Sequence, residues 1–151
     1  LDVTNKEIYG AMYNYHAVAS DKLCPEGWHV PTDDEWKELE GTIDSDFEVG
    51  NQIWDAQGWR GSDVGCKLKS GENWLAEGTG TDEIGFTAMP GGERDGQTGE
   101  FQRIEEWGNW WAHKNGDEAD VFRRYLSSPN GNIARFNCNP ASGYSVRCVK
   151  N

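Results

Sequence analysis

The sequence lacks several features that mark common classes of protein. Its 151 residues hold 14 Lys and Arg against 26 Asp and Glu, which gives a formal net charge of −12. So acidic a chain is a poor ligand for nucleic acid or for an anionic membrane surface, because both attract clustered Lys and Arg. No apolar run approaches the roughly 20 residues that a membrane-spanning helix needs. We therefore expect neither nucleic-acid binding nor membrane insertion.

Common catalytic and metal-binding motifs are also missing. The chain contains no GxSxG, HExxH or DxDxDG pattern, and it has only three histidines. No two of its four cysteines form a CxxC pair, so the short-spaced zinc and thioredoxin patterns are absent. We therefore expect a protein that is not an enzyme and that binds no resident metal.

The cysteines themselves lie far apart, at Cys24, Cys66, Cys138 and Cys148. An even number of widely separated cysteines is typical of two disulfides in an oxidising compartment, and three pairings are compatible with the spacing. Four reduced, buried thiols in a cytosolic protein are the alternative that the residues alone leave open.

Aromatic residues and glycine are plentiful, with eight Trp, five Tyr, five Phe and 19 Gly. This composition predicts many short strands and turns around an aromatic core, within a single domain that spans residues 1–151. One helix is expected after Pro31, because Thr32 and Glu35 form a capping box. Trp36 and the apolar residues that follow it then fall on one helical face.

Strands are expected elsewhere in the chain. The first twenty residues alternate aromatic and small side chains, which predicts a strand or hairpin. Asp95 and Gly96 predict a tight hairpin turn that needs positive φ. Helix first and strands afterwards indicates an α+β fold, and the later strands are expected at 107–113, 121–127, 131–137 and 143–149.

Several segments together resemble one known family. They are, in order, LCPEGWHVPTDDEW, CKLKS, GFTAMPGGERDG, WGNWWA, RRYL and GYSVRCVK, and they span about residues 8–150. The chain resembles the Fibrobacter succinogenes major paralogous domain, a branch of the C-type lectin fold that is related to formylglycine-generating enzymes. The resemblance implies a C-type lectin-like fold of one or two helices and several short, mainly antiparallel strands. It also implies a secreted or displayed module, on a cell or virion surface.

The same resemblance implies how the cysteines pair. In C-type lectin folds the two chain ends lie side by side as strands, which makes Cys24 and Cys148 partners. Trp28 and Trp36 would pack beside that bridge, and His29 would be a half-buried strand residue. Cys66 and Cys138 remain as the second pair, although family members usually lack cysteines at these two positions. A bridge that closes more than a hundred residues contributes about 4–5 kcal/mol in chain-entropy models.

The fold also suggests two alternative activities, and the sequence lacks the motif that is usual for each of them. A formylglycine-generating type of oxidase needs two reactive cysteines a few residues apart, whereas Cys138 and Cys148 are ten apart. A calcium-dependent glycan-binding lectin usually shows an acidic residue and Asn around a Pro, and neither SPN nor CNP has that form. The run NGDEAD at 115–120 could offer calcium the oxygen ligands of Asp117, Glu118 and Asp120, although such a run is more often a solvated loop. No cofactor is expected, and calcium is the alternative that the sequence leaves open.

The segment 109–139 has the composition of a binding surface. It holds six of the eleven Asn in the chain, together with aromatic residues and Arg, a mixture that is typical of paratopes. Asn is equally typical of turns between short strands, so composition alone does not separate the two interpretations. The residues expected on the exposed face are Trp110, His113, Asn115, Asp117, Asp120, Arg123, Asn130, Asn132, Ala134, Phe136, Asn137 and Asn139.

The resemblance extends this expectation to function. Some variable proteins of diversity-generating retroelements have domains of this kind, and their Asn-rich C-terminal segments are the ones diversified. The chain is thus expected to be a non-catalytic receptor or adhesion module that binds a protein or glycan through a variable C-terminal face. A structural or adhesion domain of the cell envelope is the alternative.

Overall fold

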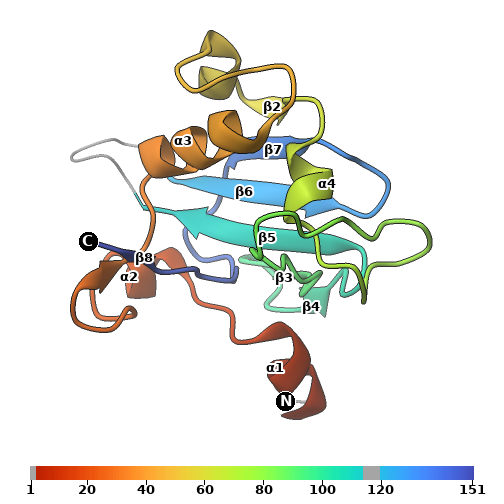
Figure 1. The fold of residues 1–151 in the computed structure, drawn as a ribbon. Coiled ribbons are helices and arrows are strands. Elements are labelled where there is room, and N and C mark those ends of the chain that lie inside the picture. The colour runs from red at the N-terminus through yellow and green to blue at the C-terminus, as the bar shows by residue number, and fades with distance from the viewer. Residues whose placement is uncertain (1–2, 114–119) are drawn as a thin grey trace.

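Four strands form the main sheet of the protein, whose computed structural model describes residues 3–113 and 120–151 (Figure 1). The sheet has the order β2-β7-β6-β5, and all its neighbouring strands are antiparallel. Two further pairs, β1 with β8 and β3 with β4, are also antiparallel. The expected α+β class is confirmed. The elements are α1 (Val3–Tyr9), α2 (Tyr15–Val18), β1 (Trp28–His29), α3 (Asp33–Ile43), the 3₁₀ helix η1 (Gln52–Asp55), β2 (Gly58–Arg60), α4 (Val64–Leu68), β3 (Glu93–Arg94), β4 (Phe101–Gln102), β5 (Trp107–Ala112), β6 (Phe122–Ser127), β7 (Ile133–Asn137) and β8 (Val149–Lys150).

Helix α3 begins where the capping box predicts. The Thr32 side chain accepts a hydrogen bond from the Glu35 backbone amide, and the Glu35 carboxylate accepts one from the Thr32 amide in return. The helix buries Trp36 against the sheet. Near its end Gly41 is required, because a Cβ there would lie 2.6 Å from the Cα of Val49. No other helix of the described residues reaches eight residues, and none is long and apolar enough to cross a membrane.

The two faces of the sheet have different neighbours. Because side chains alternate along a strand, Phe122 and Leu126 of β6 share one face while Arg123 and Tyr125 share the other. Phe122 and Leu126 pack in the main core with residues of α3, η1 and α4, and we call this the inner face (Figure 1). The opposite side is the outer face. Its end near Trp111 is covered by a second cluster, formed with residues of the N-terminal and C-terminal segments.

Charged side chains are buried between α3 and the inner face. Arg124 is fully buried and donates hydrogen bonds to the carboxylates of Asp33 (2.7 Å) and Glu40. Arg60 donates to the other oxygen of Glu40 at 2.5 Å, and Arg135 donates to Asp33 at 2.8 Å. Burial alone raises the pKa of Asp33, but the hydrogen bonds and charges of Arg135 and Arg124 outweigh it and hold that pKa well below its usual range. The network joins helix to sheet.

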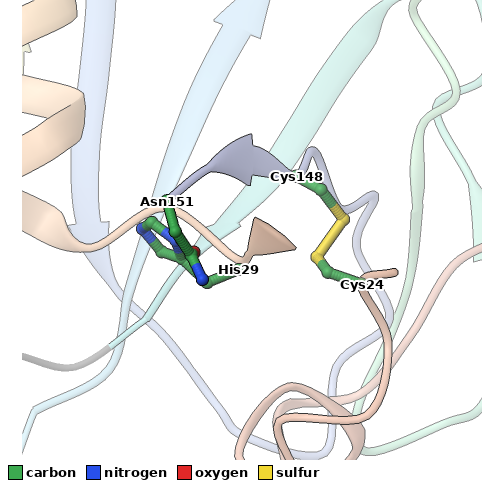
Figure 2. Close-up of a disulfide and its surroundings, with 4 residues drawn as sticks. All are labelled: Cys24, His29, Cys148 and Asn151. Atoms are coloured by element: carbon green, nitrogen blue, oxygen red, sulfur yellow. A yellow bond between two sulfur atoms is a disulfide. The ribbon is translucent and has the colours of Figure 1, made fainter. Parts of the chain in front are cut away.

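The two ends of the chain are joined as the resemblance implied. β1 and β8 pair antiparallel, and Cys24 and Cys148 form a disulfide with their Cα atoms 5.8 Å apart (Figure 2). The bridge is consistent with an extracellular, oxidising environment. Trp28 nevertheless stays 44% exposed, because its strand lies at the surface rather than in the core.

His29 adds hydrogen bonds beside the pair of strands β1 and β8. Its Nδ1 lies 2.6 Å from Oδ1 of Asn151, and its Nε2 lies 2.8 Å from Oε1 of Glu35. The hydrogen bonds with Asn151 and Glu35 raise the pKa of His29, because both nitrogens face acceptors and the protonated ring can donate to both. The imidazole therefore connects the C-terminal strand to the first turn of α3.

Four other expectations need correction. Residues 3–20 contain helices α1 and α2 rather than a strand or hairpin, and Asn14 caps the second helix. The hairpin after Asp95 exists, but its left-handed residue is Gly99 and not Gly96. Asp95 accepts hydrogen bonds from two backbone amides of this turn, and these bonds stabilise a turn that is longer than two residues. Segment 143–149 makes isolated bridges, and only β8 at its end is a strand.

The fourth correction concerns the second disulfide, because Cys66 and Cys138 are free thiols. They belong to separate parts of the fold. Cys66 lies in α4, where its amide donates to the Gly131 carbonyl. Cys138 packs in the second cluster beside Trp111 and Tyr144, on the other side of the sheet. Sheet and core therefore separate the two sulfurs.

Candidate functional site

The outer face carries four neighbouring aromatic residues, one from each strand of the sheet. Tyr125 of β6 is their centre, with ring centroids of Trp59 at 5.1 Å, Trp107 at 5.3 Å and Phe136 at 6.3 Å. The rings are tilted against one another or meet edge to face, the arrangement that aromatic pairs prefer. We call these four residues the aromatic row. They bring β2, β5, β6 and β7 to one surface.

The aromatic row is accessible. Trp59 is 39% exposed, and Trp107, Tyr125 and Phe136 are half-buried. Partly exposed rings that are already held by neighbours lose little side-chain entropy when a ligand covers them. Tryptophan and tyrosine are also the residues that most often dominate binding energy at interfaces. The row therefore has the physical properties of a recognition surface.

Ala134 explains why two rings of the row meet. It pairs in register with Trp59 on one side and with Tyr125 on the other. The two rings close over its methyl group, and Ala134 is fully buried. A larger side chain would push the rings apart, so the small residue sets their spacing.

Arg123 lies at one end of the row, next to Tyr125 and Phe136. Its guanidinium carbon lies 5.3 Å from the Tyr125 ring centroid and 6.0 Å from that of Phe136. Nη1 donates to the Glu93 carboxylate at 2.8 Å, to Asn109 Oδ1 at 2.9 Å and to the Tyr144 hydroxyl at 3.1 Å.

One other guanidinium nitrogen of Arg123, Nε, is less well satisfied. Within residues 3–113 and 120–151, its buried Nε has no hydrogen-bond partner. Glu93 balances the charge of Arg123 at 2.8 Å. The result is a half-buried polar group beside the rings, whose charge Glu93 balances.

Among the residues expected to bind, Arg123 and Phe136 lie on this surface. Two expectations were wrong. Trp110 is 3% exposed and packs in the main core, because β5 turns its even-numbered side chains toward the inner face. Ala134 is on the outer face but lies beneath Trp59 and Tyr125, so it supports the surface without being exposed.

Four of the other predicted residues, Asp120, Asn130, Asn132 and Asn137, lie at the ends of strands β6 and β7. Asn130 and Asn132 lie in the connecting turn, where the Asn130 side-chain amide donates to Ser127 Oγ at 2.8 Å. Asn137 donates to Asp120 at the other end, at 2.7 Å. These bonds are structural ones within turns and strand ends. His113 follows β5 beside Asp21, Asn139 bonds the amide of Ala141, and Asn115 and Asp117 lie outside the described residues.

Sequence reasoning missed Trp59, Trp107, Tyr125 and Glu93 as members of the surface. Trp107 and Tyr125 could have been predicted, because strand alternation places them on the face of the sheet that points away from the core residue Leu126. Trp59 and Glu93 gave no such signal. They come from distant parts of the chain, and only the strand order brings them beside β6 and β7.

Metal and thiol chemistry find little support in the part of the chain that the structure describes. No three His, Cys, Asp or Glu side chains there are grouped as a metal site requires, and the NGDEAD run lies largely outside it. Burial raises the pKa of the Cys138 thiol to about 12, so it stays protonated and unreactive at neutral pH. The charges of the inner face are buried and paired with one another, and Arg60 Nε is the one buried nitrogen among them that has no hydrogen-bond partner within the described residues.

Comparisons with known proteins agree with the motifs. The family model described as Fibrobacter succinogenes major domain matches residues 2–150, nearly the whole chain. Neither the search of curated proteins nor the search of solved structures returns a match.

Proposed function

This chain belongs to the Fibrobacter succinogenes major domain family, and from that premise we propose that it is a non-catalytic ligand-binding module of the C-type lectin fold. The module would bind a protein or glycan through the outer face of its sheet and act at an extracellular surface. The disulfide between Cys24 and Cys148 supports that location, since such bridges persist in oxidising compartments.

The observation that carries the proposal is the aromatic row. An accessible Trp59 beside Tyr125 and Phe136 provides rigid apolar area, and the guanidinium of Arg123 lies next to it. Proteins seldom leave large aromatic rings exposed in a group unless another molecule covers them. The ligand would stack on the rings and accept hydrogen bonds at their edge.

The proposal includes diversification of this face, as in the variable proteins of retroelements. If substitutions serve binding, they should follow strand alternation. Sibling copies are expected to differ at Arg123, Phe136 and the Asn positions of 130–139, and to keep the buried Asn109. They should keep the inner-face residues Arg124 and Leu126, because the core depends on them. A comparison of copies within one genome, together with a search for an adjacent reverse transcriptase and template repeat, tests this. Equal variation on both faces would contradict it and favour a structural envelope domain.

A binding experiment tests the surface directly. Immobilised panels of cell-surface glycans and proteins are probed with the purified domain and with Trp59→Ala and Phe136→Ala. We expect affinity for any ligand found to fall about 30-fold or more with Trp59→Ala, the effect of losing a hot-spot residue.

Trp28→Ala is the matched control, because Trp28 is as exposed as Trp59 but lies in β1 and not on the main sheet. It should bind normally. Equal losses in the two Trp variants, with both still folded by circular dichroism, would show that the outer face is not the binding surface.

A further inference from the structure

A second surface lies at the end of the sheet where β5 begins. Here the loop that contains Leu75 runs beside the segment that follows β4 (Figure 1). The Leu75 amide donates to the Glu105 carbonyl at 2.7 Å, and Ser128 bonds both segments through the carbonyls of Leu75 and Glu106. Segments 72–77 and 100–106 therefore form one continuous surface, which we call the acidic end.

The acidic end exposes three large apolar side chains. Phe101 is 64% exposed, Leu75 50% and Ile104 40%. Left-handed backbone at Ala76, next to Leu75, and at Arg103 and Glu105, on both sides of Ile104, accompanies this exposure. Such conformations cost non-glycine residues about 1–2 kcal/mol each, so the chain is held in this form against its local preference.

Its charges have one sign. Glu72, Glu77, Glu100 and Glu105 are exposed, and none forms an ion pair with another described residue. The single basic residue of the two segments, Arg103, is already paired with Glu106 at 3.1 Å and lies 5.0 Å from the Trp107 ring centroid. Four unpaired carboxylates thus lie in the same two short segments as the exposed apolar residues.

We propose that the acidic end docks a basic, apolar segment of a protein partner. Apolar side chains of that segment would cover Leu75, Ile104 and Phe101, while its Lys and Arg would pair with the four free carboxylates. Nucleic acids and anionic membranes are repelled by the same carboxylates, which leaves a cationic polypeptide as the complementary occupant. The proposal is independent of what binds to the aromatic row.

The test uses a short amphipathic helical peptide of Lys and Leu, with a Glu–Leu peptide of the same pattern as its counterpart. Binding to the isotopically labelled domain is followed by NMR. We expect the Lys–Leu peptide to shift amide signals of 72–77 and 100–106, and the Glu–Leu peptide to shift none. Raising NaCl from about 0.05 to 0.5 M should weaken binding roughly tenfold, because exposed charges are screened at high salt.

Variants locate the contact. Leu75→Ser combined with Ile104→Ser should reduce the affinity for the Lys–Leu peptide about tenfold or more. Ile84→Ser is the matched control, because Ile84 is equally exposed and follows two acidic residues, Asp82 and Glu83, outside the acidic end. Trp59→Ala should leave peptide binding unchanged, which separates this surface from the outer face. The proposal is overturned if the peptide does not bind, if signals shift over the whole acidic surface, or if Ile84→Ser weakens binding as much as the double variant.

Discussion

The two faces of the main sheet both place arginine beside aromatic rings, yet they use the pair in opposite ways. On the inner face Arg124 lies 5.7 Å from the Trp36 ring centroid, and Asp33 and Glu40 satisfy it away from solvent. On the outer face Arg123 lies over Tyr125 and borders accessible rings.

The comparison teaches that strand parity, and not residue type, decides the role of each side chain. Arg123 and Arg124 are neighbours in the chain, but alternation sends them to different faces. One supports the fold by joining helix to sheet, whereas the other is available for contact. The following predictions test whether the faces are as different as this division implies.

The largest effect is expected from Glu40→Gln. The substitution removes the charge that faces Arg60 and Arg124, so the buried Arg60 loses its carboxylate partner and Arg124 keeps only Asp33. Breaking a buried ion pair from one side costs about 3–5 kcal/mol. Urea unfolding should show that loss, while Glu38→Gln, at an exposed position of the same helix, should show no measurable change. A stability near wild type would mean that the inner-face network contributes little.

A smaller effect is expected from acid, through Asp33. Its pKa is depressed in the folded state, so its ion pairs contribute stability that is complete above the unfolded Asp pKa of about 3.9. This stability is lost as pH falls below that value toward the lower folded pKa. The difference in unfolding free energy between wild type and Asp33→Asn should therefore shrink from pH 6 to pH 3. A difference that stays constant would contradict the assignment.

Ala134→Leu should destabilise the protein by about 1–3 kcal/mol, the usual cost of adding volume to a packed site. The larger side chain must separate Trp59 from Tyr125, so tryptophan fluorescence should change as well. Ala141→Leu, at an exposed position, is the control and should alter neither. If Ala134→Leu behaves like the control, the rings do not close over residue 134 in solution.

The smallest effect on stability is expected from Trp59→Ala. This residue is partly exposed and loses one ring contact, worth about 1 kcal/mol. Its inner-face counterpart Trp54 is fully buried, and Trp54→Ala should cost about 3–5 kcal/mol. Paired urea titrations measure both. Similar losses in the two variants would remove the distinction between a face for packing and a face for contact.

Several elements could be predicted because their signals are local. The capping box of Thr32 and Glu35 marked the start of α3, and the patterns at 107–113 and 121–127 marked β5 and β6. Trp110 was assigned to the wrong face, since composition does not show which alternate residues of a strand point toward the core. The pairing of Cys66 with Cys138 failed for a similar reason, because counting cysteines does not show which side of a sheet each one faces.

The amino-acid sequence by itself determined the class of the fold, the helix after Pro31, and, through its family motifs, the disulfide that joins the chain ends. Only the tertiary structure decided that Trp59, Trp107 and Glu93 share a surface with Phe136, and that five buried charges hold α3 to the sheet. The physical reason is the separation along the chain over which each interaction acts. Capping and alternation act over a few residues, whereas strand order and ion pairing join side chains whose positions in the chain carry no mutual signal.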